Sequence, residues 1–383
     1  MHFRYPVYKP RLTNRERENV LDCFDTTWIS SKGKYIAEFE DRFAHYLGID
    51  HALSVTNGTI AIHLALQALG VGPGDEVLVP TLSYIACANA VTYTGAKVVF
   101  VDSEPDFWQI DVADARRKIT SRTKAIMPVH LYGHACDMKA VMTLARGHNL
   151  LVVEDCAEAI GTKHGDQLVG TFGHVGCFSF FGNKTITTGE GGMVVTHDPV
   201  LADRLARLKG QGLAKGREYW HDLVGYNYRM TNICAAIGAA QMEGIHQVLA
   251  RKRTLAALYA EALRCLPLHL HREQQGTSHS YWMASILLDE GEHRDPLRAH
   301  LRAAGVETRP LFYPIHQMAM YLRPGERYPV ADSLASRGIN LPSYPDLTDD
   351  DVGEIIAAIR NYFSEQGAYA DVSPEIAYSA AGP

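Results

Sequence analysis

A single lysine carries the strongest chemical signal in the sequence. Lys184 lies in a short segment between two apolar runs, residues 176–181 and 192–196, which are typical of buried strands bounded by glycine. Lysine is usually a solvated surface charge, but burial disfavours the ammonium form, and a neutral amine can condense with an aldehyde. We therefore interpret Lys184 as an amine placed to form a Schiff base.

Schiff-base chemistry needs an electron sink, and a carboxylate commonly pairs with the pyridine nitrogen of such a cofactor. Asp155 follows the apolar run 150–153, at the carboxyl end of a predicted strand, where open α/β sheets place their ligand contacts. The alternative is that the acidic residues here cap a helix, which aspartate often does. The sequence alone leaves both roles open.

A third candidate element is a strand that turns into a helix at residues 54–63. The predicted helix 59–69 has an apolar face, so Gly58 and Thr59 lie at its N-terminus. Free N–H groups point outward there and can bind a phosphate. An ordinary capped helix would have the same sequence pattern. The interpretation as a phosphate site therefore depends on the presence of Lys184 and Asp155 in the same chain.

Composition narrows the classes of protein that fit. The chain has 383 residues, a net charge of −6 and 46% hydrophobic residues, which indicates a globular protein with two domains and no charge excess for nucleic acid or an anionic membrane. No apolar stretch approaches the roughly 20 residues that span a bilayer, and the N-terminus lacks a signal-peptide core. Seven cysteines without Cys-x-x-Cys spacing indicate reduced thiols. We expect a cytoplasmic protein.

The order of the predicted elements indicates a doubly wound α/β sheet. Strands are predicted at 76–80, 97–102, 125–130 and 150–155, with helices at 85–94, 112–119 and 138–148 between them. A long helix at 245–265 then leads to an α+β region with a strand at 280–287 and helices at 296–304 and 349–363. We predict a large domain at 1–245, a small C-terminal domain at 246–363 and a flexible tail at 364–383.

A metal site is the main alternative chemistry. His130 and His134 are four residues apart, a spacing that needs a helix, but the intervening Tyr132 and Gly133 follow a strand and indicate a turn. We therefore predict no metal.

Taken together, these motifs resemble the DegT/DnrJ/EryC1/StrS family of aminotransferases that depend on pyridoxal 5'-phosphate (PLP). The resemblance spans residues 5–363, and the matching segments are 26–31, 72–77, 126–133, 179–192 and 225–232. It implies fold type I, with a mostly parallel seven-stranded sheet between helices and a smaller α+β domain. It also implies a homodimer with active sites at the subunit interface.

The resemblance assigns a role to each matched position. Lys184 would hold PLP covalently and then serve as the catalytic base, and Asp155 would pair with the pyridinium nitrogen. Glu158 would lie near the phenolic oxygen, where relatives often carry glutamine. The remaining cofactor contacts would be Gly58, Thr59 and Ser179 at the phosphate, Asn227 from the other subunit, and Tyr84 stacked on the ring. The expected substrate contacts are Trp28, Ser30, Tyr132, Arg229, Tyr313 and His316, although Tyr313 and His316 could instead belong to a packed turn.

The implied reaction moves an amino group from L-glutamate, through the pyridoxamine form (PMP), to C4 of a nucleotide-linked 4-keto-6-deoxyhexose. Dehydratases that resemble this chain carry histidine at the position of Lys184, so the lysine favours amination. A 3-keto sugar, a dTDP-linked sugar or a keto-cyclitol remains an alternative acceptor. Glutamine is an alternative donor, and a noncatalytic PLP-binding regulator is an alternative class of protein.

Overall fold

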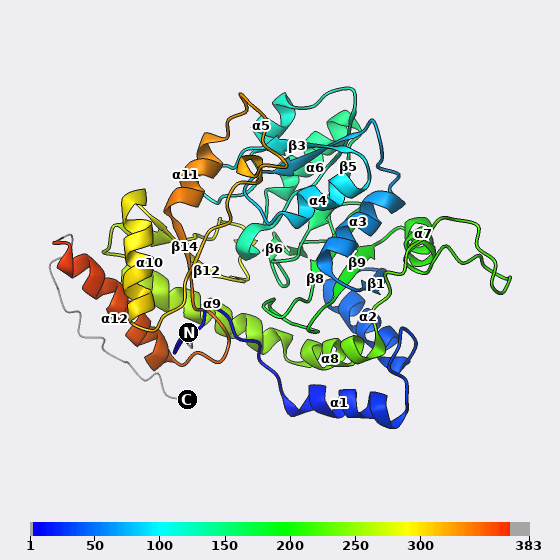
Figure 1. Ribbon diagram of the computed structural model, residues 1–383, viewed down its shortest axis with the longest axis horizontal. Coiled ribbons are helices and arrows are strands. Elements are labelled where there is room, and N and C mark those ends of the chain that lie inside the picture. Colours follow the sequence, from blue (N-terminus) through cyan, green and yellow to red (C-terminus); the bar gives the residue numbers. More distant parts are fainter. Residues whose placement is uncertain (1–2, 368–383) are drawn as a thin grey trace.

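The computed structural model describes residues 3–367, and a seven-stranded sheet forms its centre (Figure 1). The strand order is β1-β9-β8-β5-β4-β2-β3. The strands are β1 His51–Val55, β2 Glu76–Pro80, β3 Lys97–Val101, β4 Thr123–Ile126, β5 Leu151–Asp155, β8 Val175–Ser179 and β9 Gly192–Thr196. The five strands from β8 to β3 are parallel, and β9 is antiparallel to both of its neighbours. The predicted mostly parallel α/β sheet is confirmed.

Helices cover both faces of this sheet because successive strand residues point to opposite sides. In β2, Val77 and Val79 join the cluster that contains helices α3, α4 and α7, whereas Leu78 joins the one that contains α6. Helices α2 and α8 pack on this second side. The helices are α1 Asn14–Asp25, α2 Lys34–Leu47, α3 Gly58–Ala68, α4 Ala86–Tyr93, α5 Val112–Arg117, α6 Met138–His148, α7 Pro199–Lys209 and α8 Asn232–Glu243, with a 3-10 turn at Leu131–Gly133.

The C-terminal part has an α+β arrangement around a four-stranded antiparallel sheet of order β10-β12-β14-β13. Three helices, α9, α10 and α12, share its hydrophobic cluster. The elements are α9 Ile245–Leu263, β10 Leu268–Leu270, β12 Ala284–Leu288, α10 Arg294–Ala303, β13 Arg309–Pro310, α11 Pro329–Arg337, β14 Gly338–Leu341 and α12 Asp349–Glu365, with 3-10 turns at Gly291–His293 and Ile315–Gln317. A small third sheet joins β6 Lys163–His164, β7 Gln167–Leu168 and β11 Thr277–Ser278.

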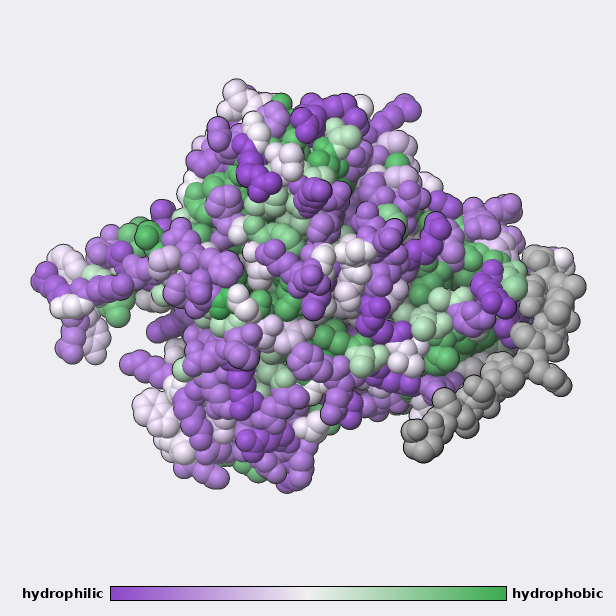
Figure 2. All heavy atoms as spheres, turned by 180° about the vertical axis from the view of Figure 1, so that it is seen from behind, coloured by the Kyte–Doolittle hydropathy of each residue, from purple (hydrophilic) through white to green (hydrophobic). Residues whose placement is uncertain are grey.

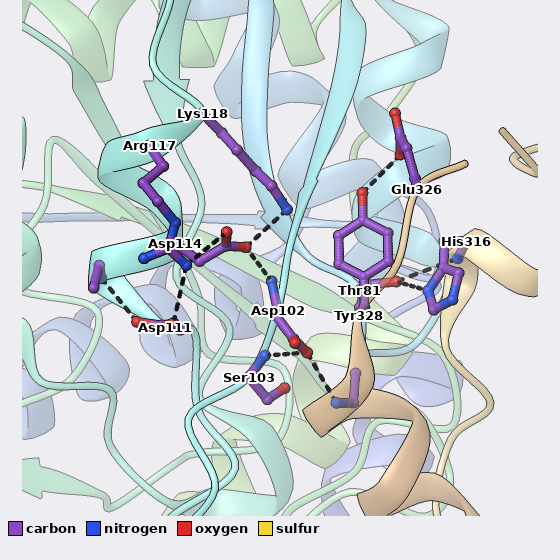
Figure 3. A network of polar contacts seen from close by, with 12 residues as sticks. Thr81, Asp102, Ser103, Asp111, Asp114, Arg117, Lys118, His316, Glu326 and Tyr328 are labelled. Carbon is purple, nitrogen blue, oxygen red and sulfur yellow. Dashed lines mark hydrogen bonds and ion pairs between the residues drawn. The ribbon is translucent and has the colours of Figure 1, made fainter. Parts of the chain in front are cut away.

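One C-terminal segment returns to the large sheet. Asp102, directly after β3, accepts hydrogen bonds at its carboxylate from the N–H groups of Val330 (3.2 Å) and Ala331 (2.9 Å) in α11 (Figure 3). Thr81, directly after β2, pairs with Nδ1 of His316 at 2.8 Å. Segment 311–335 thereby contributes to the same hydrophobic cluster as β2. The proposed division of the chain at residue 245 stays a prediction.

Several element bounds differ from those predicted. The strand predicted at 125–130 ends at Ile126, because Pro128 has no N–H to donate to a neighbouring strand. The strand predicted at 280–287 begins at Ala284, since Tyr281 has a left-handed φ of 49° that breaks the extended backbone. Helix α12 continues to Glu365, two residues into the predicted tail. Residues 368–383 of that tail lie outside the described residues.

The segment between α7 and α8 projects from the body of the molecule. This arm, residues 210–226, stands clear in both views (Figure 1 and Figure 2). Tyr219 and Val224 in the arm are 93% and 90% exposed, and Trp220 is 48% exposed. The arm therefore presents apolar side chains that its own chain does not cover.

Candidate active site

Lys184 lies in the turn between β8 and β9, at the carboxyl end of the parallel strands. Its N–H donates to the carbonyl of Phe181 at 2.9 Å, and its side chain is only 12% exposed. Nζ lies 3.9 Å from Oε1 of Glu158. Burial lowers the pKa of Lys184, although the nearby carboxylates of Glu158 and Asp155 oppose this shift. The turn therefore presents an amine that loses its proton more easily than a surface lysine.

Glu158 connects this amine to the turn after β4. Its Oε2 accepts a hydrogen bond from the N–H of Tyr132 at 2.8 Å, and the side chain is buried. Burial raises the pKa of Glu158 to about 7, against the lowering effect of Lys184. The carboxyl group can therefore exist in either protonation state near neutral pH.

Asp155 ends β5, and its carboxyl group is buried beside the same amine. Oδ1 accepts a hydrogen bond from the N–H of Ala157 at 3.0 Å, and burial raises the pKa of Asp155. Among residues 3–367, no cationic side chain forms an ion pair with it. A protonated pyridine nitrogen would supply the missing cation, so this carboxyl group fits the ring of PLP.

The turn before α3 approaches β8 and β9 so closely that two glycines are required. A Cβ atom at Gly58 would lie 2.7 Å from Cβ of Ser179, and one at Gly192 would lie 2.5 Å from the carbonyl oxygen of Asn57. The side chain of Asn57 caps the N–H of Ile60, which leaves the N–H groups of Gly58 and Thr59 free of intrahelical partners. These donors and the Ser179 hydroxyl form a cradle that fits a phosphate group.

Aromatic residues line the region between these elements. The exposed Tyr84 ring lies 5.6 Å from that of Phe312, which in turn stacks at 5.2 Å on Tyr132. The Tyr132 hydroxyl accepts a hydrogen bond from the N–H of Phe312 at 2.8 Å, and the residue is buried. The ring of Tyr84 is thus free to stack on a ligand. Tyr132 instead holds Phe312 in place through the hydrogen bond and the ring contact. The predicted contact between Tyr132 and the substrate stays a prediction.

Asn227 and Arg229 form a pair near the start of the cradle. Nη2 of Arg229 donates to Oδ1 of Asn227 at 3.0 Å, and Arg229 forms a β-bridge with Val55, at the end of β1. Asn227 is exposed. Both side chains therefore remain available to a ligand or to a second subunit.

The other predicted substrate contacts lie on different elements. The carbonyl groups of Trp28 and Ser30 hold Asn232 at the start of α8, and Trp28 borders an open cavity of about 500 Å³. The exposed Tyr313 borders a separate groove of about 380 Å³ next to α10. His316 is buried and contacts Thr81 (Figure 3). It also pairs with Asp332 at 3.4 Å. These contacts are compatible with a packed turn, and the predicted substrate contact of His316 stays a prediction.

The two histidines of the metal alternative have separate protein partners. His130 pairs with Glu154 at 3.2 Å, and its Nδ1 accepts the N–H of Cys136. His134 contacts the carbonyl of Ala135 and accepts the N–H of Gln274 at Nε2. Both rings are therefore bound into the fold by hydrogen bonds.

Two residues next to Lys184 were not among the predicted site residues. The ring of Trp282 lies 3.8 Å from Nζ of Lys184, and the hydroxyl of Tyr8 donates to the carbonyl of Lys184. Trp282 lies within the segment predicted as a plain strand, and Tyr8 precedes the first predicted element. Only an isolated bulky aromatic marked either position, which is too common a feature to indicate a site.

The DegT/DnrJ/EryC1/StrS aminotransferase family model matches residues 10–360. The chain belongs to this family. It is 54% identical over 361 residues to GDP-perosamine synthase of Escherichia coli O157:H7, covering 94% of this chain and 99% of that one. The identity to GDP-perosamine synthase of Vibrio cholerae is 51% over 363 residues, with coverages of 94% and 99%. The PLP form of Spr1654 from Streptococcus pneumoniae superposes with a TM-score of 0.89 at 26% identity, covering 95% of this chain and 99% of that one.

The protein is a PLP-dependent aminotransferase of fold type I, as the sequence predicted. The buried acid that ends β5, the amine after β8 and the glycine-lined cradle are chemically suited to the ring nitrogen, aldehyde and phosphate of PLP. The residues of the site are thus compatible with the cofactor of the family. The role of each residue stays a prediction.

Proposed function

We propose that the protein transfers the amino group of L-glutamate to C4 of GDP-4-keto-6-deoxy-D-mannose and so forms GDP-perosamine. The observation that carries this proposal is the identity of 54% and 51%, over nearly the whole of each chain, to proteins named GDP-perosamine synthase. Bound PLP supplies an electron sink for the negative charge that develops at the carbon next to the transferred nitrogen. The side chains described above would hold the cofactor, move the protons and orient the substrates.

In this proposal, Lys184 binds the cofactor covalently and then acts as a base. As the base, Nζ would remove the α-proton of glutamate and later deliver a proton to C4 of the sugar. Burial supports this role because it lowers the pKa of Lys184 and keeps a larger fraction of the amine neutral. Because a single amine would deliver this proton, it would also set the face on which C4 receives its hydrogen.

The surrounding residues orient the cofactor and the substrates. Asp155 would keep the ring nitrogen of bound PLP protonated, and Glu158, buried beside Lys184, would hydrogen-bond to the phenolic oxygen. Gly58, Thr59 and Ser179, which lie close together, would bind the phosphate in the cradle, and the exposed Tyr84 would stack on the ring. Trp28, Ser30, Arg229 and Tyr313 are proposed to contact the sugar nucleotide.

The proposal includes a homodimer in the cytoplasm. The exposed apolar residues of the arm support a partner surface, and Asn227 follows the arm directly, so it would reach the phosphate of the other subunit. None of the helices within 3–367 combines the length and apolar character needed to cross a bilayer.

A panel of acceptors tests the proposal. Glutamate is first added to the PLP-bound protein, where the absorbance should shift to the shorter-wavelength PMP form. The PMP-bound protein is then mixed with GDP- and dTDP-linked 4-keto-6-deoxyhexoses, 3-keto sugars and scyllo-inosose. The GDP-linked 4-keto sugar should restore the PLP spectrum fastest. Faster restoration by another acceptor would overturn the proposed substrate, and a spectrum unchanged by both glutamate and glutamine would overturn the proposed half-reaction.

A further inference from the structure

The peptide groups on both sides of the Lys184 α-carbon are held by side chains from distant parts of the sequence. Nε1 of Trp282 donates a hydrogen bond to the carbonyl oxygen of Asn183 at 2.7 Å. The Tyr8 hydroxyl donates to the next carbonyl oxygen, that of Lys184 itself. The segment that carries the reactive amine is thus anchored at two consecutive carbonyl groups.

Trp282 also contacts the amine at the end of the side chain. The centre of its ring lies 3.8 Å from Nζ of Lys184. Trp282 is itself buried and lies 6.1 Å from the Tyr132 ring, with the two planes nearly parallel at 13°. The indole therefore fixes the backbone before Lys184 through its N–H group and limits the space open to Nζ through its face.

Tyr8 is itself held in place by contacts of its neighbour Val7 and by the buried Lys252. The carbonyl of its neighbour Val7 accepts the N–H of Ser343, and the N–H of Val7 donates to the carboxylate of Glu307 at 2.9 Å. Below the Tyr8 ring, Nζ of the buried Lys252 lies 5.2 Å from the ring centre and donates to the carbonyl of Ser343 at 2.9 Å. The phenol consequently cannot move far without disturbing buried contacts.

We propose that Tyr8 and Trp282 are positioning residues that fix the backbone at Lys184, so that only its side-chain torsions carry Nζ between the cofactor and the substrate proton. This inference rests on the proposed role of Lys184. Its physical basis is that a reacting amine must approach its target within a narrow range of distance and direction, and that a displacement of about 1 Å can lower a rate about 100-fold.

The test compares single substitutions that remove one hydrogen bond each. Tyr8→Phe deletes only the hydroxyl, whereas Trp282→Phe deletes both the N–H group and part of the ring surface next to Nζ. Tyr259→Phe is the matched control, because its buried hydroxyl also donates to a backbone carbonyl, that of Pro342 at 3.0 Å. For each variant and for Lys184→Ala, the protein is freed of cofactor, and the rate of Schiff-base formation with added PLP is followed by absorbance across a range of pH. The half-reaction with glutamate is then measured in the reloaded protein.

Positioning predicts that Tyr8→Phe and Trp282→Phe slow Schiff-base formation about tenfold and lower kcat with little change in KM, whereas Tyr259→Phe changes neither. The melting temperatures of Tyr8→Phe and Tyr259→Phe should fall by similar amounts, which separates positioning from stability. If both Tyr8→Phe and Trp282→Phe match the control in rate, the positioning role is wrong while the role of Lys184 stands. A Schiff-base band in Lys184→Ala would overturn both.

Discussion

Nζ of Lys184 lies 3.9 Å from Oε1 of Glu158, in surroundings where burial disfavours the charged form of each group. Two such groups share a proton more readily than a solvated pair, since neither charge is stabilised by water. This relationship links the protonation of the proposed base to that of a neighbouring carboxyl group.

Substitution of the base itself gives the first prediction. Lys184→Ala should lower kcat by more than about 1000-fold and remove the Schiff-base absorbance, because the amine is proposed to act both as nucleophile and as base. Circular dichroism should show an unchanged fold, since the Lys184 side chain makes no hydrogen bond with any of residues 3–367. Near-normal turnover would contradict the proposed mechanism.

Replacement of Glu158 by glutamine should change how stability depends on pH. In the folded protein the pKa of Glu158 is raised to about 7, so the folded state holds its proton more tightly than the unfolded state does. This stabilising contribution is fully present below about pH 4.5 and is lost as the pH rises through about 7, with a slope of up to about 1.4 kcal/mol per pH unit. Urea titrations of the cofactor-free protein should show this slope, and Glu158→Gln should remove it. An identical pH profile in the variant would rule out the raised pKa.

Asp155→Asn should affect stability and activity in opposite directions. Burial raises the pKa of Asp155, so the ionised carboxyl group is costly in the cofactor-free protein and its neutral amide analogue should raise the melting temperature at pH 8. The same variant should lose about 100- to 1000-fold in kcat, because the amide cannot hold the ring nitrogen protonated. Normal kcat would show that Asp155 has only a structural role.

Three buried histidines predict a separate loss of stability in acid. The N–H of Tyr281 donates to Nδ1 of His279, whose Nε2 lies 3.3 Å from Nδ1 of His271. His134 stacks next to His271 at 5.3 Å. Burial lowers the pKa of all three rings, that of His134 to about 4. The unfolded state therefore binds more protons, and stability should fall as the pH drops from about 6.5 to about 4.

The variant His134→Gln tests this acid dependence. The side-chain carbonyl oxygen of the new glutamine can still accept the N–H of Gln274. The glutamine side chain does not titrate. Unfolding free energies should fall less steeply with acid in this variant than in the unchanged protein. His148→Gln, at an exposed position in α6, is the matched control and should keep the original slope.

Subunit mixing tests whether Asn227 serves the partner's site. Asn227→Ala should weaken PLP binding, and Lys184→Ala subunits are inactive in this proposal. A mixed dimer of the two variants contains one site with both residues intact if Asn227 acts across the interface. Mixing after partial unfolding and refolding should then restore activity at limiting PLP, whereas an Asn227 that acts within its own subunit would leave the mixture no more active than its components.

The sequence predicted those parts of the site that depend on local patterns. Strands β2 and β5 carry continuous apolar runs, so the place of Asp155 at a strand end could be predicted, and the capped start of α3 is encoded by consecutive residues around Gly58. Tyr8 and Trp282 could not be predicted in this way. Tyr8 is 176 positions from its partner Lys184, and Trp282 is 99 positions from its partner Asn183. A local sequence pattern cannot predict contacts over such separations.

The packing of α11 against the large sheet also determines how the protein can unfold. With Asp102 bound to the first turn of this helix and Leu311, Ile315 and Leu334 inside the central cluster, residues near the C-terminus complete the apolar core that begins at β1. A fragment that stopped before α9 would lack Tyr321 and Tyr328, whose rings pack against Phe100 of β3, and would leave this part of the cluster incomplete. The enzyme should consequently melt in one cooperative step, and a nascent chain cannot complete the hydrophobic cluster on this side of the sheet until α11 has been synthesised.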